Sequence, residues 1–564
     1  MRVHARKGAV IGAVGFALVL SACGGGGDDD GDGGDAGSGD TGEPTGAVVI
    51  GGCQPQNPLV PANTNETCGG DPLDAVFSKL VRYNPDTAAP ELEIAESIES
   101  EDNITWTVKL KDGWTFHDGT PITAQSFVDA WNWGAYGPNA ALNSYFFSLI
   151  GIEGAAEVAG EDANGDEVIT EDEAPVTEMS GLTVVDDLTF EIKLVAPKSD
   201  MPTSLGYTVF APLPQAFFDD PEAFGTKPIG SGPFSVVEYN ENVDLQLTAY
   251  PEYAGDTQPQ VKDVTFRIYT DQNAEYNDLL ADNVDVMTQL PESSLAGEQF
   301  KTDLGDRFIE RETGVIQTVT FAPDAVDPSM SNIDLRRAIS KAIDRDLIVE
   351  NIFQGNRTPA TGWVSPVVDG FKADQCGEWC TYDPEAAKQH LEDAGGFDGT
   401  LTLSYNADAD HQGWTEATCN SIRNAIGIDC VATPVVDFAT FREQITNREM
   451  KGIFRTGWQM DYPTIENFLG PIYASAACCG NGSNDGDYQN PDFDAKLAEA
   501  AQAPTPEEAI TLYQEAEAML AEDLPSLPMW YGKTIAGYSN NVENVKITPF
   551  STTDLLGISL AESS

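Results

Sequence analysis

Positive charge is scarce in this sequence. Its 30 Lys and Arg residues face 91 Asp and Glu residues, which gives a formal net charge of −61 at pH 7. Nucleic acid is therefore excluded as an expected partner, because binding to phosphates requires a basic surface. The acidity also fits capture of a cationic ligand. The acids are spread along the whole chain, however, and this favours a role in keeping the surface hydrated and soluble.

Histidine and the common catalytic motifs are also scarce or missing. The chain has 4 His residues, and His117 lies in a turn pattern in which we expect a structural role. There is no G-x-S-x-G elbow, no H-E-x-x-H motif and no phosphate-binding G-x-x-x-x-G-K-[ST] loop. We therefore expect no enzyme activity and no cofactor. An exported hydrolase that relies on carboxylates remains as the enzymatic alternative.

Long apolar runs are absent except near the N-terminus. There, three cationic residues precede the uncharged stretch Gly8–Leu20, which is shorter than the about 20 residues needed to span a bilayer. The letters LSAC, which end at Cys23, resemble a bacterial lipobox, in which cleavage precedes the cysteine and the thiol is acylated. We therefore expect residues 1–22 to be a lipoprotein signal peptide. An ordinary secretory peptide is the alternative.

The segment that follows Cys23 has the composition of a linker. Residues 24–46 contain glycine and acidic residues and almost no side chain that could enter a core. Such a segment stays disordered because it buries too little apolar surface to offset its chain entropy. As a Gly-rich coil it has an end-to-end distance of roughly 25 Å. We expect residues 23–46 to form a lipidated tether that holds the protein at the outer face of the cell membrane.

Cysteine usage predicts disulfide bonds. The chain has 9 Cys residues, so eight remain if Cys23 is lipidated, and an even number in an exported protein favours disulfides. A zinc site is disfavoured because few histidines are present and no C-x-x-C pair recurs. Eight cysteines allow 105 pairings, so the connectivity is open. Local pairs are the simplest hypothesis: 53–68, 376–380, 419–430 and an adjacent 478–479 bridge.

The rest of the chain alternates strand-like and helix-like patterns, which predicts an α/β fold. Ile104–Leu110 alternates apolar and polar residues with a period of two. Thr123 can cap a helix that runs through Trp131, and the residues after Asp334 carry an apolar stripe with helical spacing. Thr505 begins a capping box with proline at the first helical position, which predicts a further helix.

Three blocks in this order resemble the family 5 (oligopeptide/dipeptide type) bacterial extracellular solute-binding proteins. The first runs from Trp106 to Ala124 and contains TVKLKDGWTFHDGTPITA. The second is DLRRAISKAIDRDLI at Asp334–Ile348, and the third is RTGWQMDY at Arg455–Tyr462. The resemblance extends from about Asn57 to the end of the chain.

The resemblance implies a two-lobed periplasmic-binding-protein-like fold of type II, in its large three-region form, with a hinged ligand cleft. By analogy with the family, domain I is expected at 47–75, 183–312 and 525–564. Domain II is expected as an insertion at 76–182, and domain III at 313–524.

The resemblance also implies where a ligand binds. In the family, the carboxylate at the position of Asp461 pairs with the α-amino group of a peptide. Enclosing that ammonium in a closed cleft requires an opposing charge, because an unpaired buried ion is costly. The alternative is that Asp461 is only a turn residue before Tyr462 and Pro463.

The other expected contacts come from the same segment and from Pro61–Glu66. Arg455 is expected to meet the carboxylate of a short peptide, and a structural ion pair is the alternative. Gly457 and Trp458 are expected to offer a strand edge to an extended peptide, although Trp458 could be a core residue. The expected ligand-binding residues are Asp461, Arg455, Gly457, Trp458, Tyr462, Thr64 and Asn65.

Together these features predict a monomeric receptor that captures peptides outside the membrane and delivers them to the permease of an ABC importer. A receptor for another solute, such as a sugar, an opine or a metal chelate, is the alternative within the same class.

One further pattern lies outside this interpretation. Asp162–Glu173 reproduces the oxygen-ligand spacing of a calcium-binding EF-hand loop, but Glu167 occupies the position at which glycine allows the sharp turn. The alternative is a polar surface loop of an acidic protein, so we expect no metal.

Overall fold

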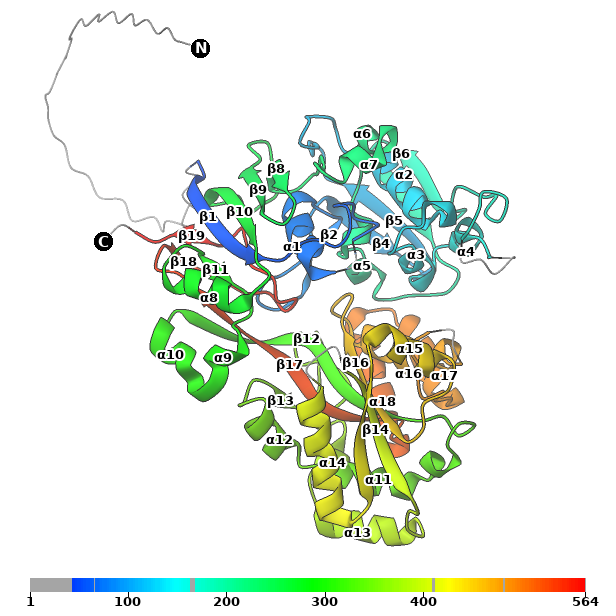
Figure 1. The fold of residues 1–564 in the computed structure, drawn as a ribbon. Helices are drawn as coiled ribbons and strands as arrows, with labels where there is room; N and C mark the ends of the chain where they lie inside the picture. Colours follow the sequence, from blue (N-terminus) through cyan, green and yellow to red (C-terminus); the bar gives the residue numbers. More distant parts are fainter. Residues whose placement is uncertain (1–42, 65, 163–167, 408–410, 480–481, 563–564) are drawn as a thin grey trace, which may run out of the picture. The chain divides into compact units, whose positions relative to one another are not determined.

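The computed structural model describes residues 43–64, 66–162, 168–407, 411–479 and 482–562 (Figure 1). The predicted signal peptide, Cys23 and most of the tether lie outside these ranges, as do Asn65 and residues 163–167 in the middle of the segment with EF-hand-like spacing. None of the helices in the described ranges combines the length and the apolar character that crossing a bilayer requires.

The largest element is a mixed sheet of 11 strands. Its central strands β12 and β17 pair antiparallel. On one side of them β1 pairs parallel with β10, and at the far end of the other side β14 pairs parallel with β15. In spatial order the strands are β15 (Asp429–Val435), β14 (Thr400–Asn406), β16 (Ile453–Gln459), β12 (Phe308–Phe321), β17 (Ser526–Tyr538), β11 (Val286–Met287), β1 (Thr45–Gly52), β10 (Val261–Ile268), β9 (Asp244–Ala249) and β8 (Phe234–Asn240), with β13 (Thr358–Pro359) also paired to β17.

A smaller antiparallel sheet contains the predicted alternating segment. Within β5, Trp106, Val108 and Leu110 are buried and the residues between them are exposed, so the predicted strand is confirmed. The order in this sheet is β4 (Ala95–Ser100), β5 (Thr105–Leu110), β7 (Thr189–Lys193) and β6 (Leu182–Asp186), and two short pairs are β2 (Val81–Tyr83) with β3 (Pro90–Leu92) and β18 (Val542–Glu543) with β19 (Ser559–Leu560).

The helices cover the sheets, which confirms the α/β class (Figure 1). Thr123 precedes α2 in a capping box, and the Thr505 side chain accepts from the Glu508 N–H at the start of α18, as predicted. The helices are α1 (Thr67–Val76), α2 (Ala124–Ala135), α3 (Tyr145–Leu149), α4 (Ala155–Ala159), α5 (Met201–Ser204), α6 (Gln215–Asp219), α7 (Pro221–Phe224), α8 (Gln272–Leu280), α9 (Glu292–Leu295), α10 (Gln299–Leu304), α11 (Ile333–Lys341), α12 (Arg345–Ile352), α13 (Pro384–Asp393), α14 (Gln412–Ile426), α15 (Phe438–Thr446), α16 (Ile465–Tyr473), α17 (Pro491–Ala501) and α18 (Pro506–Asp523).

The helical pattern after Asp334 differs from the prediction of one continuous helix. The chain forms two helices, α11 and α12, because Asp344 leaves the helical conformation and caps α12 by accepting from the Leu347 N–H. The cap of α11 is Asn332, whose side chain accepts from the N–H groups of Asp334 and Leu335. The apolar stripe continues across this break, so the sequence pattern alone did not reveal that the helix ends there.

The apolar interior forms two large clusters and one small one. The first cluster draws on β1, β5, α2 and β10, and the second on α11, α14, α16 and α18. β12 and β17 lie side by side and take part in both, since Trp530 packs in the second cluster and Ala536 in the first (Figure 1). The two strands therefore connect the cores.

The ladder between β12 and β17 is interrupted where the strands pass from one core to the other. Its register shifts between Glu312 and Ile316, so that three residues of β12 lie opposite Gly532. A Cβ atom at Gly532 would lie 2.5 Å from the Thr313 hydroxyl oxygen and 2.7 Å from the Val315 Cβ. A β-bulge of this kind bends a strand, and glycine permits the close approach of the two backbones.

All four predicted local disulfides are confirmed. They join Cys53 to Cys68, Cys376 to Cys380, Cys419 to Cys430 and the adjacent Cys478 to Cys479.

Candidate functional site

The segment after β16 positions Asp461 through one buried side chain. Asn467 on α16 is 0% exposed. Its Oδ1 accepts from the Asp461 backbone N–H at 2.9 Å and from the Trp458 indole N–H at 3.0 Å, and its Nδ2 donates to Asp461 Oδ2 at 3.0 Å. The orientation of both predicted site residues is therefore fixed by Asn467, whose role the sequence alone did not suggest.

The Asp461 carboxyl lies in an unfavourable place for a charge. Burial raises its pKa to about 6, and Glu466 adds to this effect, although the hydrogen bond from Asn467 opposes it. No Lys or Arg within the described ranges forms an ion pair with this carboxyl. A cationic ligand group would supply the missing countercharge.

Asp461 lines a cavity of about 440 Å³. Its neighbours Gln459 and Met460 line the same side. The other walls come from segments far away in the chain, namely Thr64, α1 and the region around Tyr145 and Tyr207. The cavity thus lies between segments that pack in different cores.

The structure brings Thr64 to the same cavity as Asp461, but it does not bring Tyr462 there. Thr64 is 4% exposed, and its hydroxyl donates to the Pro58 carbonyl oxygen at 3.1 Å. Tyr462 is 0% exposed, and its hydroxyl donates to Glu466 Oε2 at 2.9 Å. Tyr462 is therefore positioned to support the segment from behind rather than to face the cavity.

Arg455, Gly457 and Trp458 line a different cavity of about 230 Å³. The Arg455 Nε donates to Asn406 Oδ1 at 2.9 Å, and the guanidinium carbon lies 5.3 Å from the ring centre of Phe438. Much of the remaining wall consists of threonine and aromatic residues, namely Thr318, Thr320, Thr456, Phe441, Tyr473 and Tyr488.

β16 has an open edge beside this cavity. It pairs along its whole length with β12, but β14 pairs only with Ile453 and Phe454. Because the Met460 N–H donates to the Gly314 carbonyl oxygen, the antiparallel alternation directs the backbone groups of Gly457 and Gln459 away from β12. No described strand occupies that side, so an extended chain could pair with β16 there.

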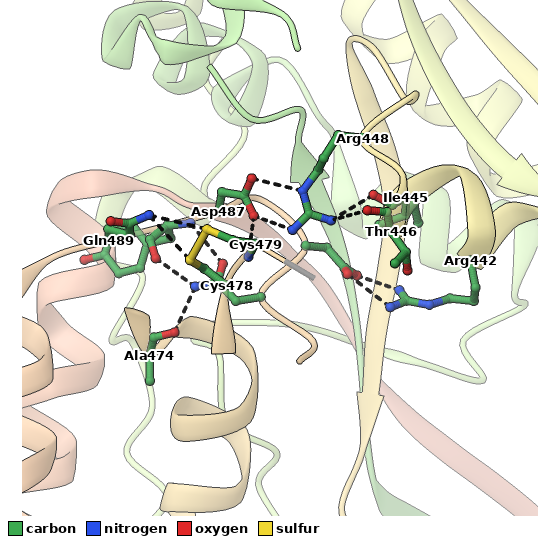
Figure 2. A network of polar contacts seen from close by, with 12 residues as sticks. Arg442, Ile445, Thr446, Arg448, Ala474, Cys478, Cys479, Asp487 and Gln489 are labelled. Carbon is green, nitrogen blue, oxygen red and sulfur yellow. Dashed lines mark hydrogen bonds and ion pairs between the residues drawn. A yellow bond between two sulfur atoms is a disulfide. The ribbon is translucent and has the colours of Figure 1, made fainter. Parts of the chain in front are cut away.

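A loop that the sequence reasoning missed closes one side of the 230 Å³ cavity. Asp485 pairs with Arg442 at 2.6 Å. Asp487 pairs with Arg448 at 2.5 Å (Figure 2). The Cys479 N–H donates to Asp487 Oδ1 at 2.9 Å, next to the vicinal disulfide (Figure 2). These ion pairs join residues about 40 positions apart. They could not be predicted from the sequence, because its many acidic residues offer each arginine several possible partners.

Comparison with known proteins identifies the family. A model described as bacterial extracellular solute-binding proteins, family 5 (middle), matches residues 89–477, which is more than half of the chain. The chain belongs to this family. Its members are solute-binding proteins rather than enzymes and act outside the cytoplasm.

Family 5 relatives match over nearly the whole length. The oligopeptide-binding protein OppA of Bacillus subtilis is 26% identical over 92% of this chain and 92% of the relative. Heme-binding protein A of Haemophilus influenzae is 25% identical over 86% of this chain and 87% of its own length. The unliganded open form of the murein tripeptide-binding protein MppA superposes with a TM-score of 0.76 at 22% identity, covering 92% of this chain and 97% of that one. The expected two-lobed α/β fold is thereby confirmed.

Proposed function

We propose that this family 5 protein captures peptides outside the cell membrane and delivers them to the permease of an ABC importer. The observation that carries this proposal is Asp461, a half-buried carboxyl with no cation paired to it among the described residues, next to an open strand edge. A peptide supplies both missing partners, because its α-ammonium neutralises a carboxylate and its backbone completes a strand ladder.

In this proposal the α-ammonium binds to Asp461 and the first residues extend along Gly457 of β16. Thr64 lies on the opposite wall, and Tyr462 supports Asp461. Asn65, which falls outside the described residues, is included in the proposal as a neighbour of Thr64 in the sequence. Arg455 supplies positive charge near β16 that suits the peptide carboxylate. The three-region division of the chain and the lipid anchor at Cys23 belong to the same proposal, since a tethered receptor remains close to its permease.

A non-peptide solute is the second candidate. It is favoured by one observation, namely that the relative from Haemophilus influenzae carries the name heme-binding protein A at 25% identity. Native mass spectrometry of the purified protein separates the candidates, because a slowly released ligand stays bound. A mixture of short peptides supports the main proposal, whereas a single non-peptide solute overturns it and leaves the receptor class intact.

The role of Asp461 is tested with free and N-acetylated Ala-Ala-Ala. We expect Asp461→Ala to weaken binding of the free peptide by about 2–5 kcal/mol, the range for removing one partner of a buried charge pair. Acetylation of the peptide should reduce its affinity for the wild type by a comparable amount and should change its affinity for the variant little. Isothermal titration calorimetry at pH 7.5 measures all four combinations. Equal affinity of the wild type for both peptides would show that Asp461 does not bind the α-amino group.

A further inference from the structure

Two cavities meet at α1. The cavity of about 440 Å³ at Asp461 and a neighbouring cavity of about 310 Å³, called the side cavity below, share Thr67, Asp71 and Phe550 in their walls. The side cavity therefore extends the proposed ligand site past Asp71, toward α8 and the Cys53–Cys68 disulfide.

Glu275 on α8 lines the side cavity and is 9% exposed. Its carboxyl forms no hydrogen bond or ion pair within the described part of the chain, and burial alone raises its pKa to about 7. The carboxyl lies against Gly51 of β1, where the Cβ of any other residue would overlap with it. A buried, unpaired carboxyl is costly, and proteins rarely retain one without a partner for it.

Asp71 is the second carboxyl in the described wall of the side cavity whose side chain forms no hydrogen bond or ion pair. It lies between the two cavities, and burial raises its pKa, with additional contributions from Asp74 and Glu66. Its neighbours are already engaged. Asp74 pairs with Lys79 at 2.7 Å, and Glu66 accepts from the Gly69 N–H at the start of α1.

No Lys or Arg occurs in the described wall of the side cavity, which instead carries Asp71, Asp271 and Glu275. Asp271 accepts from the Asn273 N–H and caps α8, so Asp71 and Glu275 are the groups left for a ligand. In the larger cavity the only cation in the described wall is Lys79, which is held by Asp74.

Aromatic rings provide an independent indication of a cationic ligand. Tyr83, Tyr145 and Tyr207 all line the larger cavity. Tyr207 is stacked on Phe146 with ring centres 4.2 Å apart, whereas Tyr145 is 52% exposed. Tyrosine faces attract ammonium and guanidinium groups, so the approach to the side cavity suits a long cationic side chain.

We propose that Glu275 and Asp71 form a subsite for the positively charged side chain of a lysine or arginine in one of the first two positions of a bound peptide. This inference rests on the proposed function, because it takes the peptide α-ammonium to be at Asp461. The side cavity accommodates the aliphatic stem, and the two carboxyls receive the charge. A neutral side chain would leave the buried Glu275 carboxyl and the half-buried Asp71 carboxyl without a partner.

Matched tripeptides test the proposal by calorimetry on the full-length protein. Lys-Ala-Ala and Ala-Lys-Ala are compared with their norleucine counterparts, which have the same apolar length and no charge. At least one lysine peptide should bind about ten-fold or more tightly than its counterpart, as expected for one partly screened charge pair. Glu275→Gln and Asp71→Asn should each reduce this ratio several-fold. The exposed carboxyl of Glu238 provides the control, and Glu238→Gln should retain the wild-type ratio.

The outcomes separate this inference from the proposed function. If the wild type binds lysine and norleucine peptides equally, the subsite is refuted and peptide capture stands. If Glu275→Gln and Asp71→Asn both keep the full ratio, the charge is recognised elsewhere and the assignment is wrong. If none of the four peptides binds, both proposals fail together.

Discussion

At the scale of single residues, Glu517 is a deeply buried carboxyl that lies outside the proposed ligand site. It is 1% exposed on α18, and its Oε1 accepts from the backbone N–H groups of Trp363 at 2.8 Å and Val364 at 3.2 Å. Burial nevertheless raises its pKa to about 7. Since the folded protein binds this proton more tightly than the unfolded chain, stability from this group is highest at low pH and falls as pH rises toward 7.

Glu517→Gln should remove that pH dependence. Glutamine keeps an oxygen acceptor for the two N–H groups and carries no charge, so at pH 8 the variant should be more stable than the wild type by roughly 1–3 kcal/mol. At pH 4.5 the two proteins should be about equally stable. Urea unfolding at both pH values gives the comparison, with the exposed Glu238→Gln as control. A pH-independent difference between variant and wild type would contradict this account.

At the scale of elements, a buried cation links the loop before α5 to α16. Lys198 is 9% exposed, and its ammonium lies 3.0 Å from both Asp200 and Glu466. Burial works against its charge, but these two carboxylates outweigh it and raise the pKa of Lys198. The neighbouring Ser199 hydroxyl donates to the Ala500 carbonyl oxygen at 3.1 Å, so the loop is anchored to the helices of the second core.

Replacing Lys198 with Met should be strongly destabilising. The change leaves Asp200 and Glu466 facing each other without a cation, for which a loss of about 3–5 kcal/mol is expected. Lys109→Met is the matched control, because Lys109 pairs with Glu96 at 2.7 Å with both side chains 53% exposed. That pair should contribute less than about 1 kcal/mol. Similar losses for the two variants in urea unfolding would refute the network as a stabilising feature.

Individual elements were predictable from the sequence wherever a local rule determines them. The period-two segment became β5, the capping box at Thr505 became the start of α18, and cysteines close in sequence paired. The break at Asp344 was missed because an aspartate that caps a helix leaves the apolar stripe intact. The order of the large sheet could not be predicted, since pairs such as β11 with β17 join segments about 250 residues apart.

The candidate site was predictable only in part, for a similar reason. Asp461, Arg455 and Thr64 came from a resemblance, and the structure distributes them over two cavities. Glu275 and Asp71 could not be predicted as site residues, because the sequence contains 91 acidic residues and nothing in it distinguishes these two. Only the fold places both of them in the wall of one cavity.

At the scale of the whole folded region, β12 and β17 connect two cores that contribute opposite walls of the ligand cavity. Asp461 follows β16 in the second core, whereas Thr64 and α1 pack with the first. A ligand that contacts both walls stabilises arrangements in which they are close. The interrupted ladder opposite Gly532 is the place where such a movement would be absorbed.

Peptide binding should therefore make the protein more compact, and the effect should depend on pH. Burial raises the pKa of Asp461 to about 6. Above that value the carboxylate is charged and can bind an ammonium directly. Below it a proton must first leave, so the affinity for the peptide should fall by up to about ten-fold per pH unit.

Small-angle X-ray scattering with saturating Ala-Ala-Ala at pH 7.5 should give a smaller radius of gyration than without peptide. At pH 5 the same peptide concentration should give a weaker response, and N-acetylated peptide should give little at either pH. If binding at pH 7.5 leaves the radius of gyration unchanged, the cores do not move on β12 and β17. If affinity is the same at both pH values, the ammonium is bound by a group other than Asp461.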